Sequence, residues 1–72
     1  MPLFLAPTNC DLRVTHIGGT DKIVGHLASL GIVEEEIIRV LSHEAGGVIV
    51  RVEESRLALD HDIAKGILVA II

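Results

Sequence analysis

The chain has 72 residues, half of them apolar, and Phe4 is its only aromatic residue. A chain this short forms one domain over residues 1–72 and buries only about 60 % of its unfolded surface, so its core has to be built efficiently from branched aliphatic side chains, which favour sheets. The net charge of −4, six basic residues scattered along the sequence and the lack of stacking aromatics argue against nucleic acid as a partner.

The opening segment, residues 1–10, does not resemble a targeting sequence. Its first seven residues, MPLFLAP, contain neither a basic region nor a long apolar stretch, so they do not predict a secretory signal. Cys10 is the only cysteine, so an internal disulfide is excluded and a reducing compartment is the simpler interpretation. We therefore expect a cytoplasmic protein in which Cys10 is a small, buried residue near the first strand.

Residues 11–17 alternate in polarity with a period of two, which predicts a half-buried strand. In this pattern Leu12, Val14 and His16 share one face, and we expect His16 to lie on a partly buried surface. The pair Gly18-Gly19 ends the strand.

The next stretch, TDKIVGHLASLG, predicts one short amphipathic helix. Thr20 is a favourable N-cap and Gly31 is placed where a helix ends. Ile23, Leu27 and Leu30 have the spacing of one apolar stripe along a helix. A solvated turn containing three consecutive glutamates, residues 34–36, follows.

Two further strands are predicted around Gly46-Gly47. Residues 36–43 are apolar on both faces, as in a strand that is covered on one side and partly covered on the other. Two adjacent glycines favour a hairpin turn with positive φ angles. In the strand that follows, Val48, Val50 and Val52 share one face and are expected to point inward.

The remaining residues predict two more strands joined by a helical turn. Residues 56–59 form a short strand after the turn at residues 53–55. In residues 60–66, Asp60 can cap a turn that exposes His61 and Asp62, whereas Ile63 and Ala64 pack inward. Residues 67–72 form the last strand, and six apolar residues are too few for a membrane helix, which needs roughly 20. Five short strands and one helix suggest a small antiparallel barrel, closed so that no edge stays exposed.

The motifs HLASLGI, IIRVL, GGVIVRV, RLAL and IAKGILV, in this order, resemble the FeoA family over nearly the whole chain from Cys10 onward. FeoA proteins are small accessory proteins of bacterial ferrous-iron uptake. The resemblance implies a mainly β, SH3-like barrel of about five strands with one short inserted helix, related to the C-terminal domain of iron-dependent repressors. It also implies a role as a non-catalytic partner of FeoB, the membrane ferrous-iron transporter.

The residues themselves do not predict catalysis. They contain no nucleophile with a base, no phosphate-binding loop and no cofactor motif. Metal binding is an alternative, because side chains that can ligate Fe²⁺ or Zn²⁺ are present, although their spacing does not form a known metal motif. No cofactor is required by either interpretation. The candidate metal ligands are Asp60, His61, Asp62, His43 and Glu44.

A partner-binding surface is the other candidate site. The last strand is hydrophobic on both faces, and only one face can fill the barrel, so the other face needs cover from the helix, a homodimer contact or another protein. We expect the cytosolic domain of a FeoB-like transporter to dock on a hydrophobic surface around the helix and this strand. The candidate residues are Leu27, Leu30, Leu68 and Ile72.

Overall fold

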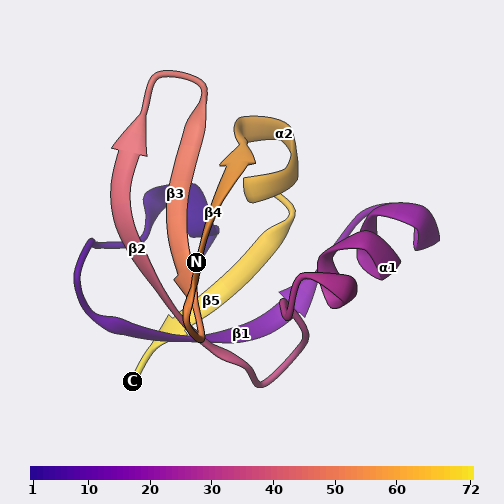
Figure 1. Ribbon diagram of the computed structural model, residues 1–72, viewed down its shortest axis with the longest axis horizontal. Coiled ribbons are helices and arrows are strands. Elements are labelled where there is room, and N and C mark those ends of the chain that lie inside the picture. The colour runs from indigo at the N-terminus through magenta and orange to yellow at the C-terminus, as the bar shows by residue number, and fades with distance from the viewer.

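The computed structural model describes residues 1–72 as one antiparallel sheet with two helices and an opening 3₁₀ turn. The sheet has the strand order β4-β3-β2-β1-β5, and helix α1 projects away from it (Figure 1). The elements in chain order are the 3₁₀ turn Leu3–Leu5, β1 Asp11–Ile17, α1 Asp21–Ser29, β2 Ile37–Glu44, β3 Gly47–Val52, β4 Ser55–Asp60, α2 His61–Ala64 and β5 Ile67–Ile71.

The mainly β, SH3-like fold with five antiparallel strands is confirmed, but the sheet is not closed. β4 and β5 form the two ends of the strand order, and the chain passes between them through α2 instead of pairing them directly. The β5 edge is covered by the start of the chain, because the Val69 N–H donates to the carbonyl oxygen of Met1 over 2.7 Å. An isolated bridge between Pro2 and Leu68 extends this cover.

The core is entirely aliphatic, and it is built from the inward faces of the strands and from both helices. The predicted inward residues Val48, Val50 and Val52 are buried, as is Ala64 of α2. The opening segment, which sequence analysis left without a structural role, adds buried residues of its own. The buried residues are Leu3, Ala6, Leu12, Val14, Ile17, Leu27, Ile32, Ile38, Val40, Val48, Val50, Val52, Leu59, Ala64, Ile67 and Val69.

The alternation predicted for β1 is interrupted near its end. His16 is exposed and Ile17 is buried, the reverse of the expected faces. The register between β1 and β5 shifts between Val14 and His16, so one extra residue enters β1 at this point. Such a bulge moves every following side chain to the opposite face of the sheet.

The turn after β2 also differs from the prediction. Ala45 and Gly46 connect the paired residues Glu44 and Gly47, and neither Gly46 nor Gly47 has a positive φ. The positive φ in the hairpins belongs instead to Glu53, in the turn between β3 and β4. The second glycine is needed for space, since the backbone of Leu59 in the neighbouring strand β4 occupies the place that a Cβ atom at Gly47 would take.

Candidate functional site

Helix α1 has well-defined ends although it projects from the sheet. The Thr20 hydroxyl accepts a hydrogen bond from the Ile23 N–H over 3.2 Å, as predicted for an N-cap. At the other end, Gly31 adopts a φ of 92°, and the Ile32 N–H donates to the carbonyl oxygen of Leu27 over 2.9 Å. This C-terminal cap turns the chain back toward the sheet and buries Ile32.

The segment after α1 is held beside β1 by backbone hydrogen bonds. The Glu35 N–H donates to the carbonyl oxygen of Val14 over 2.8 Å, and the Val14 N–H donates to that of Glu36 over 2.9 Å. These bonds place residues 32–34 next to the end of β1 and opposite α1. The end of β1, helix α1 and the segment after α1 therefore meet at one surface.

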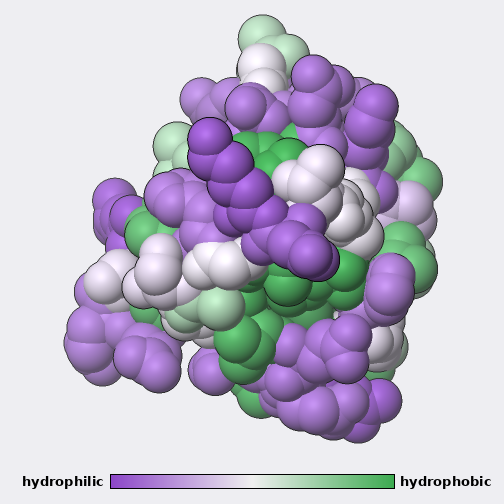
Figure 2. Space-filling model, turned by 90° about the vertical axis from the view of Figure 1, so that its right-hand side faces the viewer, coloured by the Kyte–Doolittle hydropathy of each residue, from purple (hydrophilic) through white to green (hydrophobic).

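An apolar groove of about 360 Å³ lies where these segments meet. Figure 2 views the molecule from the side on which α1 lies and shows apolar atoms exposed among the polar side chains. Val33 in the groove is 41 % exposed. A groove with this composition suits an apolar segment of another molecule better than a small polar substrate. Its lining residues are Ile17, Val24, Ala28, Ile32, Val33 and Glu34.

The rim of the groove carries charge on one side. Glu34 lines the groove, and one of its carboxylate oxygens lies 3.8 Å from the Nδ1 atom of His16. Both side chains are largely exposed, so this contact adds little stability. His16 pairs with Leu68 across the β1–β5 ladder, and Leu68 is 36 % exposed. A further exposed apolar side chain therefore lies beyond the polar rim, on β5.

The structure separates the four predicted partner-binding residues. Leu27 is only 1 % exposed and belongs to the core, so it is not available to a partner in this conformation. Leu30 is half-buried at the end of α1. Leu68 is exposed near the α1 end of β5, whereas Ile72 is 69 % exposed at the opposite end, beside Asp11. The stripe predicted from α1 is therefore mostly its buried face.

The groove residues Val24, Ala28 and Val33 were not among the residues predicted to bind a partner. The sequence did contain a signal that Val24 and Ala28 lie on one face of the helix. They are four positions apart, and each follows a residue of the predicted apolar stripe, Ile23 or Leu27, by one position. The part played by Val33 could not be predicted, because it depends on how the segment after Gly31 turns back onto β1.

Four of the five candidate metal ligands have structural partners, and no group of three His, Cys, Asp or Glu side chains is arranged to hold an ion. The His43 Nε2 atom hydrogen-bonds to the carbonyl oxygen of Ala6 over 2.8 Å. The His61 ring packs edge-on against Phe4, with ring centres 4.8 Å apart. Glu44 is exposed at the end of β2.

The two aspartates that flank His61 also have local partners. One carboxylate oxygen of Asp60 accepts from the Ile63 N–H over 2.9 Å and caps α2, as predicted. Asp62 lies 3.7 Å from the Lys65 ammonium group. Each of the two carboxylates therefore supports the turn that contains it.

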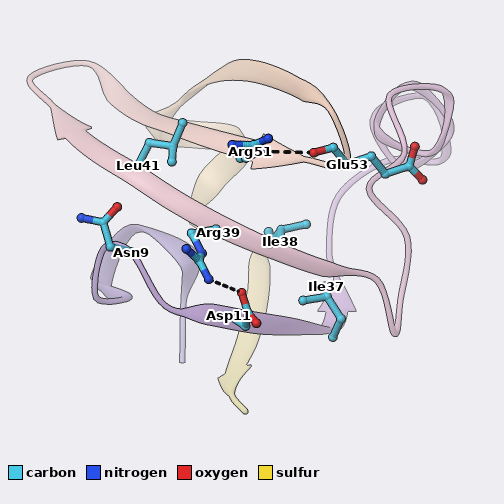
Figure 3. Close-up of a pocket in the computed structure, with 8 residues that line it drawn as sticks. All are labelled: Asn9, Asp11, Ile37, Ile38, Arg39, Leu41, Arg51 and Glu53. Atoms are coloured by element: carbon cyan, nitrogen blue, oxygen red, sulfur yellow. Dashed lines mark hydrogen bonds and ion pairs between the residues drawn. The ribbon is translucent and has the colours of Figure 1, made fainter.

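A second hollow, of about 510 Å³, lies on the outer face of β1, β2 and β3 (Figure 3). The Arg39 guanidinium donates to a carboxylate oxygen of Asp11 over 2.7 Å, and the Arg51 Nε–H donates to the carbonyl oxygen of Glu53 over 3.3 Å. Of its charged groups, Asp11 and Arg39 therefore pair with each other, whereas Arg51 is held by a backbone carbonyl oxygen. Cys10 is partly buried near this region, in weak contact with the carbonyl oxygen of Pro7.

The strand register gathers basic residues that are scattered in the sequence. Arg39 lies directly opposite Arg51, and Arg51 lies directly opposite Arg56. Half of the six basic residues therefore form one row across β2, β3 and β4. The pair of Arg51 and Arg56 follows from counting outward from the turn between β3 and β4, so the sequence contained this signal.

Neither helix of the structure is both long and apolar enough to cross a membrane. The chain also matches no curated protein. Its relationships come instead from a family model and from solved structures.

Solved structures share the fold over nearly the entire chain. A crystal structure of an iron uptake regulatory protein (FeoA) is 26 % identical, with a TM-score of 0.86 over 96 % of this chain and 93 % of that one. The solution structure of FeoA from Chlorobium tepidum is 23 % identical, with a TM-score of 0.88 over 99 % of this chain and 70 % of that one. IdeR from T. acidophilum is 25 % identical, with a TM-score of 0.87, but 99 % of this chain covers only 33 % of that protein.

The family model adds information about the sequence itself. The model of the FeoA domain matches residues 1–71. Together with the shared fold, this match over almost every residue shows that the chain belongs to the FeoA domain family.

Proposed function

We propose that this chain is a non-catalytic accessory protein of ferrous-iron uptake, which acts in the cytoplasm by binding the cytosolic part of a FeoB-like transporter. Membership in the FeoA family and the likeness to an iron uptake regulatory protein support the role in iron uptake. The observation that carries the binding mode is the exposed apolar groove between α1 and the segment that follows it.

The proposed contact surface has an apolar centre and an acidic rim. Val33 and Ala28 would contact apolar side chains of the transporter, and Glu34 would face a basic one. The surface would extend over His16 to Leu68. Burial of about 300 Å² of apolar area, at roughly 25 cal/mol per Å², favours association by several kcal/mol before the cost of lost motion.

The proposed mechanism is docking, and it requires neither a cofactor nor a covalent step. A bound accessory domain can change a transporter only through a difference in its affinity for two states of that transporter. The groove would therefore contact a segment of the transporter's cytosolic domain that differs between those states.

Binding to the purified cytosolic domain of the transporter tests the proposal with two matched variants. Val33→Asp places a carboxylate in the groove and should weaken binding by about tenfold or more. Ile37→Asp is the control, because Ile37 is 42 % exposed, almost the same as Val33, but lies on the outer face of β2.

Leu68→Asp measures how far the contact extends along β5, and it should weaken binding less than Val33→Asp. If Val33→Asp is folded and binds as tightly as the unsubstituted chain, the groove is not the docking site. Equal losses for Val33→Asp and Ile37→Asp would show a general effect of charge.

A further inference from the structure

The two edges of the sheet are covered differently. At the β5 edge, the backbone of Met1 exchanges hydrogen bonds with that of Val69 over 2.7 and 2.8 Å. At the β4 edge, no backbone hydrogen bond joins residues 55–59 to any segment other than β3. An unpaired edge is a template on which another strand can add. β4 is therefore the edge strand of this sheet whose residues 55–59 have no backbone partner other than β3.

The ladder between β3 and β4 shows which backbone groups point outward. The His61 N–H donates to the carbonyl oxygen of Gly46 over 2.9 Å, immediately after the last residue of β4. Because hydrogen bonds alternate along an antiparallel ladder, residues 55, 57 and 59 bond to β3. The N–H and C=O groups of Arg56 and Ala58 and the N–H of Asp60 consequently point away from β3. The C=O of Asp60 instead accepts the first hydrogen bond of α2, because Asp60 is the N-cap of that helix.

The sequence of this edge, RLALD, is complementary to itself when it is paired antiparallel about its centre. Ala58 then lies opposite Ala58, and Arg56 lies opposite Asp60. On the other face of the strand, Leu57 lies opposite Leu59. Each side chain thus meets a partner of opposite charge or of matching apolar character.

We propose that β4 pairs antiparallel with β4 of a second copy of this chain, about a twofold axis at Ala58. The Ala58 N–H and C=O groups would exchange hydrogen bonds with those of the second Ala58, and the Asp60 N–H would donate to the Arg56 carbonyl oxygen of the second copy. The two sheets would then become continuous. An interface of this kind is the same patch on both subunits, so it closes as a dimer. The α1 groove lies outside this interface, so the dimer is independent of transporter binding.

Within one copy, the positive charge of Arg56 on β4 has no negative partner. Arg56 has no ion pair in the chain, and it lies opposite Arg51, which lies opposite Arg39. Like charges directly opposite one another destabilise a sheet. Asp11 supplies a counter-charge at the β1 end of this row. Asp60 of the second copy would supply one at the β4 end.

The other residues of the edge fit the same arrangement. Asp60 uses its Oδ1 atom to cap α2, so its second carboxylate oxygen can accept from Arg56 of the second copy. Leu57 faces inward, opposite the buried Val50, yet it is only half-buried because no strand lies on its outer side. Leu59 of the second copy would cover it.

Sedimentation velocity of the full chain, from micromolar to millimolar concentration, measures the self-association. We expect a monomer–dimer equilibrium. Its Kd should rise as salt is added, because exposed ion pairs are screened. Arg56→Asp places two carboxylates opposite each other and should raise the dimer Kd by about tenfold or more. Lys22→Asp on α1, which makes the same change in charge elsewhere, should leave the Kd unchanged.

One further variant and one mixture of two variants distinguish pairing at the β4 edge from a general effect of charge. Ala58→Pro removes an outward N–H without removing a bond to β3, so it should abolish the dimer while the thermal unfolding curve shows a folded chain. A mixture of Arg56→Asp and Asp60→Arg chains should form a heterodimer, because each carboxylate then meets a guanidinium.

A chain that stays monomeric at millimolar concentration would overturn the proposal. A dimer that Arg56→Asp and Ala58→Pro leave intact would place the interface elsewhere and would also overturn it. The same holds for a monomer whose binding to the transporter domain is lost in Ala58→Pro, since another protein's strand would then occupy the edge.

Discussion

Gly47 lies so close to the backbone of Leu59 in the neighbouring strand that no Cβ atom fits between them. A Cβ atom at Gly47 would overlap the carbonyl oxygen of Leu59 and lie 2.9 Å from the Cα atom of Asp60. We predict that Gly47→Ala destabilises the fold by about 1–3 kcal/mol, because backbone atoms cannot move aside as a flexible side chain can. Thermal unfolding should show a loss of about 4–8 °C in Tm for each kcal/mol.

Gly46→Ala is the matched control, because nothing lies within 4 Å of a Cβ at Gly46 and its φ is not positive. Its Tm should stay close to that of the unsubstituted chain. Equal losses for the two variants would mean that the turn conformation, rather than the contact with Leu59, requires glycine.

Leu27 anchors α1 in the core, so its substitution should act on stability before it acts on any partner. We predict that Leu27→Ala lowers the free energy of unfolding by about 2–5 kcal/mol, since it leaves a cavity under the helix. Chemical denaturation followed by circular dichroism measures this loss. A fully stable variant with weakened transporter binding would instead return Leu27 to the docking surface.

Few contacts hold the projecting helix α1 to the sheet, so we expect its stability to depend on the cap at Thr20. We predict that Thr20→Ala costs about 1 kcal/mol, whereas Thr20→Ser, which keeps the accepting hydroxyl, stays near the original stability. Amide hydrogen exchange of α1 should accelerate in the first variant only. Equal exchange in all three proteins would show that the Ile23 N–H does not depend on this hydroxyl.

Metal binding can be tested apart from docking by calorimetric titration of metal-free protein with Fe²⁺ and Zn²⁺. The docking function predicts no stoichiometric binding at micromolar affinity, because His43 and His61 have separate structural partners. Micromolar binding that His61→Ala abolishes would favour the metal-binding alternative. The same titration of His43→Ala would show whether both imidazoles contribute.

Local signals made the helix and the β3–β4 hairpin predictable. Thr20 and Gly31 mark the two ends of α1 through hydrogen bonds and backbone geometry within one turn of the helix. The alternation of Val48, Val50 and Val52 requires only a period of two. Asp60 caps α2 through a contact three residues away. In each case the interacting residues are close in the sequence.

The features that were not predicted, or that were placed on another face of the fold, depend on contacts between distant residues. The bulge that exposes His16 arises from the register between β1 and β5. The opening segment became core because the backbone of residue 1 pairs with that of Val69. Leu27 was placed on a docking surface because an apolar stripe on a helix does not reveal which face will be buried.

The amino-acid sequence by itself determined the class of fold, the position of most strands, the ends of α1 and the resemblance to the FeoA family. Only the tertiary structure decided that the sheet stays open at β4, that an apolar groove forms beside Val33 and that three arginines share one row. The physical reason is that periodicity and capping act within a few residues, whereas register and edge pairing depend on segments that meet only in the folded chain.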